Sequence, residues 1–211
     1  MGDYATALRY HQMDLENARQ LGITQLQGRA CGNLGAVHEA LGNLEEAVRC
    51  QEQHLAHAAA ASDRLARAVA LGALGRVHHA RGAPDQAVAY LRQGLAIAES
   101  LGRREEEARI RHRLGVALWA CGQAEGARQQ LVLADALLVA LRGRARQGGP
   151  RGTRIASLQA ATTRALQTVL VGLGRQQDAL VVAENGRSRS LVDLLLEKNA
   201  PASTNNNAQA C

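Results

Sequence analysis

The side chains best suited to metal or acid–base chemistry in this 211-residue sequence are its seven histidines. His54 and His57 are three residues apart and could share one helix face, whereas His78 and His79 are adjacent and point about 100° apart. No cysteine joins either pair at the spacing of zinc ligands, and no H-E-x-x-H motif occurs. We interpret the histidines as ordinary helix-surface residues, and we expect no metal site and no cofactor.

Other reactive residue types form no catalytic pattern. Gly72 and Gly75 have G-x-x-G spacing, but a repeat described below explains them better than a phosphate-binding loop does. Ser188 and Ser190 lie between arginines and could be phosphorylated, although short Arg/Ser strings are common in helices. None of the four cysteines forms a C-x-x-C pair, which is typical of a reduced intracellular protein. We expect a cytoplasmic protein that is not an enzyme and has no small-molecule substrate.

The composition predicts an all-helical chain. Apolar residues make up 46% of the sequence but aromatics only 2%, with no Phe, so Ala, Leu and Val must build the core. Ala and Leu are strong helix formers, and only three prolines interrupt the chain. The apolar run from Leu131 to Leu141 is interrupted by Asp135 and is too short to span a bilayer. No basic-then-apolar leader opens the sequence.

Internal repetition is the strongest signal in the sequence. Five columns coincide at a spacing of 40 residues, which indicates a solenoid of helix pairs. The aligned segments are NLGAVHEALGNLEEAV from Asn33, ALGRVHHARGAPDQAV from Ala73 and RLGVALWACGQAEGAR from Arg113.

Two glycine columns have different physical roles. Gly75 and its counterparts Gly35 and Gly115 lie inside a helix, where glycine costs about 1 kcal/mol relative to alanine. This cost makes sense if a neighbouring helix must approach closely. Gly82 lies where the apolar period ends, a position that requires a left-handed residue, and Pro84 then suits the first turn of the next helix.

We expect helix-pair units over residues 1–141, a flexible basic loop over 142–152, a final helix pair over 153–199 and a disordered tail over 200–211. Residues 2–21 match a second helix without its first partner, so the first unit is half missing. Twelve extra residues separate the fourth unit from the fifth. The predicted pairs are 25–41 with 44–61, 64–81 with 84–101, and 104–121 with 124–141. The acidic run Glu105 to Glu107 opens one of these helices, where negative charge favours the helix dipole.

The repeated Leu-Gly, Ala-x-Gly and following Ala resemble the tetratricopeptide repeat over roughly residues 2–190. The resemblance implies a right-handed α-solenoid of stacked antiparallel helix pairs. The 40-residue spacing is similar to that of the Leu-Gly-Asn spindle-orientation adaptors, although Ala36, Arg76 and Val116 stand where those proteins commonly have Asn. Residues 183–195 look like the segment that joins such repeats to a caspase-like CHAT domain.

The resemblance also implies a binding surface, because first helices line the concave face of a tetratricopeptide superhelix. The implied ligand is an acidic peptide or helix of a partner protein with one apolar anchor, since arginine pairs well with carboxylates and Trp offers apolar area. The implied groove residues are Arg29, Asn33, Glu39, Arg76, His79, Arg109, His112, Arg113 and Trp119.

Three function classes remain open at this point. The first is a scaffold or adaptor that binds an acidic segment. The second is a regulatory repeat arm of a CHAT-domain protein, truncated before that domain. The third is binding of nucleic acid or acidic lipid through the 142–154 region, because charges cancel over residues 1–141 and the whole net charge of +6 falls in residues 142–211. The scarcity of aromatic residues for stacking argues against nucleic acid.

Overall fold

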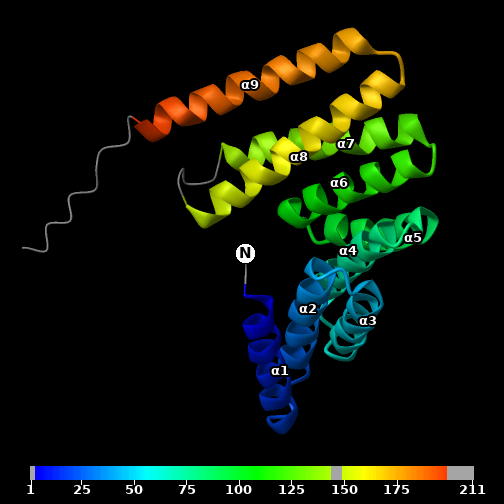
Figure 1. Cartoon of the computed structure of the whole chain (residues 1–211), viewed down its shortest axis with the longest axis vertical. Coiled ribbons are helices and arrows are strands. Elements are labelled where there is room, and N and C mark those ends of the chain that lie inside the picture. Colours follow the sequence, from blue (N-terminus) through cyan, green and yellow to red (C-terminus); the bar gives the residue numbers. More distant parts are fainter. Residues whose placement is uncertain (1–2, 144–148, 199–211) are drawn as a thin grey trace, which may run out of the picture.

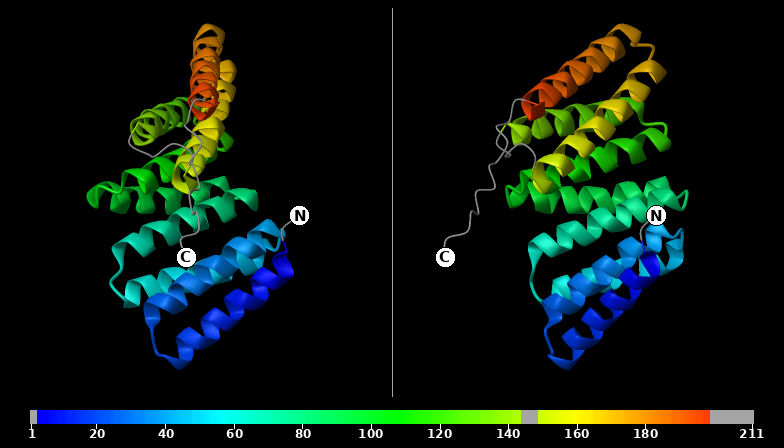
Figure 2. Two further views of the ribbon diagram at one scale, coloured as in Figure 1. Left: turned by 90° about the vertical axis from the view of Figure 1, so that its left-hand side faces the viewer. Right: turned by 60° about the vertical axis from the view of Figure 1, so that its left-hand side comes forward.

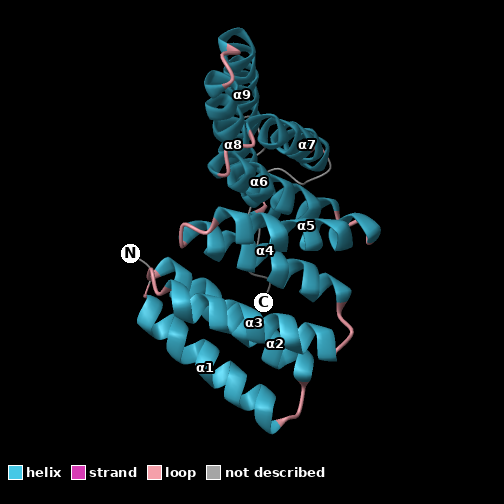
Figure 3. Cartoon of the chain, turned by 90° about the vertical axis from the view of Figure 1, so that its right-hand side faces the viewer, coloured by secondary structure: helices cyan, strands magenta, loops and turns pink. Residues whose placement is uncertain are grey.

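The computed structural model describes the backbone of residues 3–143 and 149–198, and the side chains of these residues as far as Arg187. Within this part of the chain there are nine α-helices and no strand, which confirms the all-α prediction (Figure 1, Figure 3). The helices are α1 (Tyr4–Gln20), α2 (Thr24–Ala40), α3 (Leu44–Ala60), α4 (Arg64–Ala80), α5 (Pro84–Ser100), α6 (Arg104–Ala120), α7 (Ala124–Arg142), α8 (Pro150–Gly172) and α9 (Gln176–Lys198).

Consecutive helices pack against each other along the whole stack. The pairs are α2 with α3, α4 with α5, α6 with α7 and α8 with α9, and each pair contacts the next. Figure 2 shows the stack as an elongated solenoid running from α1 to α9. The first helices also contact each other directly, α2 with α4, α4 with α6 and α6 with α8. These four helices therefore form one continuous face of the solenoid.

Helix ends recur every 20 residues, which is half of the sequence period. Gly42, Gly82 and Gly122 have φ between +74° and +78°, as predicted for the ends of first helices. Gly22 and Gly102 end second helices in the same way, and Ser62 takes this role with φ of +54°. In each case the next amide donates to a carbonyl five residues back, as Ala83 does to His78 at 2.9 Å.

The second glycine column lies where paired helices touch. A Cβ on Gly115 would lie 2.6 Å from Leu131 Cγ, and one on Gly35 would lie 2.5 Å from Gln51 Nε2. A Cβ on Gly75 would overlap Leu91. These contacts agree with the close approach that the sequence predicts. They join α2, α4 and α6 to their partner helices at equivalent positions of the repeat.

The core is built from small and branched aliphatic side chains, as the composition predicts. One cluster runs from α4 to α9 and includes Leu91, Leu131 and Val169, each almost completely buried. Ala87 and Ala127, from the first turn of their helices, are fully buried as well. The alanine column therefore marks positions where a larger side chain has no room.

The twelve extra residues of the last unit lengthen helices as well as a connection. Helix α8 has 23 residues and α7 has 19, whereas α6 has 17. The predicted loop over 142–152 is therefore too long, because Arg142 ends α7 and Pro150 begins α8. Residues 144–148, and the predicted tail from 200, lie outside the described residues.

No helix in the described ranges is both long and apolar enough to cross a membrane.

We predict that Gly75→Leu destabilises the chain by about 1–3 kcal/mol, because the new side chain must displace Leu91. Ala80→Leu, at an exposed position on the same helix, is the matched control and should change stability by less than about 0.5 kcal/mol. Urea unfolding followed by circular dichroism measures both. A Gly75→Leu variant as stable as the parent would remove the packing argument.

Candidate functional site

Two cavities lie side by side on the face formed by the first helices. The first, of about 550 Å³, is lined mainly by α2, α4 and α6. The second, of about 510 Å³, is lined mainly by α4, α6 and α8. Both are lined by the same three arginines, Arg76, Arg109 and Arg113. We call the combined surface of the two cavities the groove.

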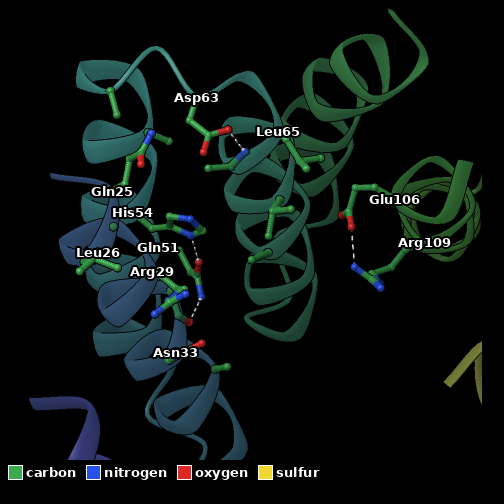
Figure 4. Close-up of a pocket in the computed structure, with 18 of the residues that line it drawn as sticks. Gln25, Leu26, Arg29, Asn33, Gln51, His54, Asp63, Leu65, Glu106 and Arg109 are labelled. Carbon is green, nitrogen blue, oxygen red and sulfur yellow. Dashed lines mark hydrogen bonds and ion pairs between the residues drawn. The ribbon is translucent and has the colours of Figure 1, made fainter. Parts of the chain in front are cut away.

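Two of the three shared arginines already have carboxylate partners. Arg76 Nη1 on α4 pairs with Glu39 Oε1 on α2, so this ion pair links two adjacent first helices. Arg109 Nη1 pairs with Glu106 Oε2 at 2.5 Å and its Nη2 with Glu105 Oε1 at 3.4 Å (Figure 4). Burial raises the pKa of Glu39, and the nearby charge of Arg76 opposes that effect. These two arginines are therefore held in place by the protein itself.

Arg113 differs because it has no such partner. Within the described residues its guanidinium makes no hydrogen bond and no ion pair, although it lines both cavities. Burial, and then the charges of Arg76 and Arg109, lower its pKa to about 10, so it stays protonated at neutral pH. Gly72 leaves room for it, since a Cβ there would lie 3.2 Å from Arg113 Nη1. The charges of Glu106 and Glu39 oppose the lowering of the Arg113 pKa, but neither carboxylate forms an ion pair with Arg113. A partly buried cation without a direct ion pair favours an anionic ligand.

The lining residues as a group are also cationic. Five arginines line the two cavities against three carboxylates, a formal excess of two positive charges. The arginines are Arg29, Arg76, Arg109, Arg113 and Arg154, and the carboxylates are Asp63, Glu105 and Glu106. The acidic run at the start of α6 thus does more than favour the helix dipole, because two of its members hold Arg109.

His112 lines the second cavity in a fixed orientation. Thr162 Oγ1 donates to the carbonyl of Leu158 at 2.8 Å, which leaves this oxygen to accept from His112 Nδ1 at 3.1 Å. Burial, and secondarily the charge of Arg113, lower the pKa of His112 to about 4. The imidazole is therefore neutral at physiological pH.

The remaining predicted groove residues are placed as follows. Arg29 and Asn33 line the first cavity, and His79 lines the second. Two predicted residues, Glu39 and Trp119, belong to the lining of neither cavity. Glu39 contributes indirectly, through its ion pair with Arg76. Trp119 lies against another helix. Its ring packs on α8, where a Cβ on Gly172 would overlap it. Packing against α8 therefore occupies part of the Trp119 ring, and its role as a groove residue stays a prediction.

Sequence reasoning missed the floor of the first cavity. Gln51 and His54 reach it from α3, a second helix, past Gly28 and Gly32 of α2 (Figure 4). His54 is only 8% exposed and His78 only 6%, so both are buried and not the surface histidines we expected. His78 stacks on Tyr90, with the ring centroids 5.1 Å apart.

Among the described residues no group of three His, Cys, Asp or Glu could hold a metal ion.

Apolar side chains contribute to the lining of both cavities. Leu65 and Val69 of α4 line the first cavity, and Val116, Ile155 and Leu158 line the second. The groove therefore has apolar walls on both sides of the central arginines. Apolar walls beside polar groups that can fix the orientation of a ligand are typical of a binding site.

The stacked helix pairs, their glycine-ended helices and the groove along the first helices define a tetratricopeptide-repeat solenoid. Residues 26–100 match the family profile described as tetratricopeptide repeat. This part of the chain therefore consists of tetratricopeptide repeats, and the tetratricopeptide fold is a scaffold type that in general serves protein interaction.

Two curated proteins are similar in sequence to part of this chain. Tetratricopeptide repeat protein 28 of Mus musculus is 50% identical over 98 residues, and that of Homo sapiens is 50% identical over 97 residues. Each match spans 46% of this chain but only 4% of the relative's length.

Solved structures at lower identity share the fold. BtubC (BKLC) from P. vanneervenii superposes with a TM-score of 0.74 at 16% identity, over 100% of this chain and 80% of that one. A putative kinesin light chain with TPR-like repeats from Podosopora anserina reaches 0.58 at 21% identity, over 89% and 96% of the two chains. The MamA protein reaches 0.55 at 12% identity, over 98% of this chain and 100% of that one.

We predict that stability falls as the pH is lowered from 6.5 to 4, partly because of His112. In this window the unfolded chain binds a proton at residue 112 that the folded chain does not, so protonation favours unfolding. The contribution lost is on the order of 2–3 kcal/mol. In the His112→Gln variant the free energy of unfolding should fall less between pH 6.5 and 4 than in the parent. In the control variant His57→Gln, which changes a residue outside both cavities, it should fall as much as in the parent. Parallel curves for the parent and His112→Gln would contradict the assignment.

Proposed function

We propose that the groove binds an acidic segment of a partner protein, with Arg113 as the principal ionic contact and Arg76 and Arg109 beside it. The observation that carries this proposal is the unpaired Arg113 guanidinium, which lines both cavities. A carboxylate placed between the three arginines would supply the partner that the fold does not. The free thiols of Cys31, Cys50 and Cys121 are consistent with a cytoplasmic setting for this interaction.

The geometry suggests how such a segment lies. The cavities continue into each other across α4 and α6, so an extended or helical segment can pass over the arginines and keep its neighbouring side chains on apolar walls. Leu65 and Val69 would receive one apolar side chain, and Ile155 and Leu158 another. This arrangement replaces the single tryptophan anchor that the sequence suggested.

The proposal predicts the effect of single arginine substitutions. An array of nine-residue peptides with a central Glu, and a matched array with a central Gln, identifies segments that bind through their charge. For the best Glu peptide, Arg113→Gln should weaken binding by roughly 30-fold, the effect of losing about 2 kcal/mol at an interface hot spot. Arg67→Gln is the matched control, because Arg67 is exposed on α4 and lines neither cavity.

The same titrations separate the groove from the basic segment after α7. If Arg113→Gln binds like the parent while a double Arg144→Gln, Arg146→Gln variant loses binding, the groove is not the site. Binding of a phosphate-bearing ligand by that segment would also weaken steeply with salt, by about one logarithmic unit of slope per phosphate contact. If no peptide binds in a Glu-dependent manner, the acidic specificity is wrong.

The 50% identity to tetratricopeptide repeat protein 28 favours a second candidate function, a repeat arm that regulates a longer protein. The groove would then receive a segment of that longer protein rather than a separate partner. Sequencing the gene and its transcripts beyond the codon for Lys198 tests this directly. An open reading frame that continues into a caspase-like domain would support it, and transcripts that all end after Cys211 would contradict it.

A further inference from the structure

Two glycines of α2 leave space through which a side chain of α3 reaches the groove. Gly28 and Gly32 are one helical turn apart, and both line the first cavity. A Cβ on Gly32 would lie 2.8 Å from His54 Nδ1, and one on Gly28 would lie 3.5 Å from His54 Cδ2. The imidazole of His54, on α3, therefore lies close to α2 and lines the cavity (Figure 4).

A chain of hydrogen bonds determines which imidazole nitrogen carries the proton. Gln51 Nε2 donates to the carbonyl of Gly32 at 3.0 Å, so the amide oxygen of Gln51 must face His54. That oxygen can only accept, and it lies 3.4 Å from His54 Nδ1. His54 Nδ1 is therefore the protonated nitrogen, and His54 Nε2 carries a lone pair.

The lone pair of His54 Nε2 has no donor within the described part of the chain. The side chain is 8% exposed and lines the cavity. Burial lowers the pKa of His54, which keeps the ring neutral and Nε2 an acceptor. His54 Nε2 is not among the described side-chain atoms that are both fully buried and without a partner, so it is accessible from the cavity. A donor of a bound ligand can therefore take the place of water at this acceptor.

We propose that His54, positioned by Gln51, forms a second recognition point in the groove, which accepts a hydrogen bond from a neutral hydroxyl or amide side chain of the bound segment. The donor is neutral because four arginines line the same cavity against two carboxylates, so a lysine or arginine of the ligand would be repelled. The proposal rests on the proposed function, since the donor belongs to the segment whose carboxylate meets Arg113. It adds a specificity that charge alone cannot provide.

Threonine and valine have nearly the same shape, and only threonine donates a hydrogen bond, so this pair isolates the contact. The probe is the best Glu-centred nine-residue peptide from the array, with Thr or Val placed at each other position in turn. At one position the parent should prefer Thr over Val by about five- to tenfold. At the others the two peptides should bind alike.

Two substitutions of His54 distinguish recognition from support of the fold. The amide of a His54→Gln variant ends where Nε2 lies, so it can still accept from the ligand. The amide of a His54→Asn variant ends near Nδ1, so it can bond Gln51 but cannot reach the ligand. The preference for Thr should persist in His54→Gln and disappear in His54→Asn, while both variants keep the preference for Glu over Gln. Thermal unfolding of both variants establishes that they fold.

The tautomer is measurable without any ligand. In the free chain at pH 7, the ¹⁵N shifts of His54 should show a protonated Nδ1 and an unprotonated Nε2. A protonated Nε2, or a Glu-dependent peptide that shows no preference for Thr at any position, would overturn this inference and leave the proposed function standing. Absence of any Glu-dependent binding would overturn both.

Discussion

Three helix pairs, α2–α3, α4–α5 and α6–α7, depend on close contact between the two helices at a glycine of the first helix. At Gly75 and Gly115 the partner's leucine occupies the space that a side chain would need, and at Gly35 a glutamine does so. Because these contacts recur every 40 residues, the three pairs repeat the same contact. The first helices are consequently aligned on one face, where residues 37 apart in sequence become neighbours. The Glu39–Arg76 ion pair is one result.

That alignment determines the electrostatics of the groove. Arginines from α4 and α6 converge, and the carboxylates that α2 and α6 supply hold Arg76 and Arg109 but leave Arg113 unpaired. Burial strengthens the effect, because the same desolvation that lowers the pKa of Arg113 makes an incoming carboxylate more favourable. Gly28, Gly32 and Gly72 contribute in a second way, since their missing side chains make room for His54 and Arg113. Glycine thus shapes both the packing and the binding surface.

The sequence predicted the fold closely because its strongest signals are local and repeated. A left-handed glycine ends each first helix, so those boundaries were correct within about a residue. Two helix boundaries were not signalled by a glycine in this way. Ser62 follows α3 in a left-handed conformation that usually requires glycine or asparagine. Helix α8 begins at Pro150, inside the predicted loop. The site was harder to predict. Which arginine stays unpaired, where Trp119 packs and how His54 reaches the groove all depend on contacts between helices, which periodicity does not encode.

The central claim is a direct ionic contact between Arg113 and a ligand carboxylate, and a charge exchange tests it most directly. The measurement is the affinity of the Arg113→Glu chain and of the parent for the best Glu-centred peptide and for the same peptide with Arg at its centre. We predict that each single reversal lowers affinity strongly and that the two reversals together restore a substantial part of it. A doubly reversed pair that binds no better than either single reversal, in a chain that folds normally, would contradict the account.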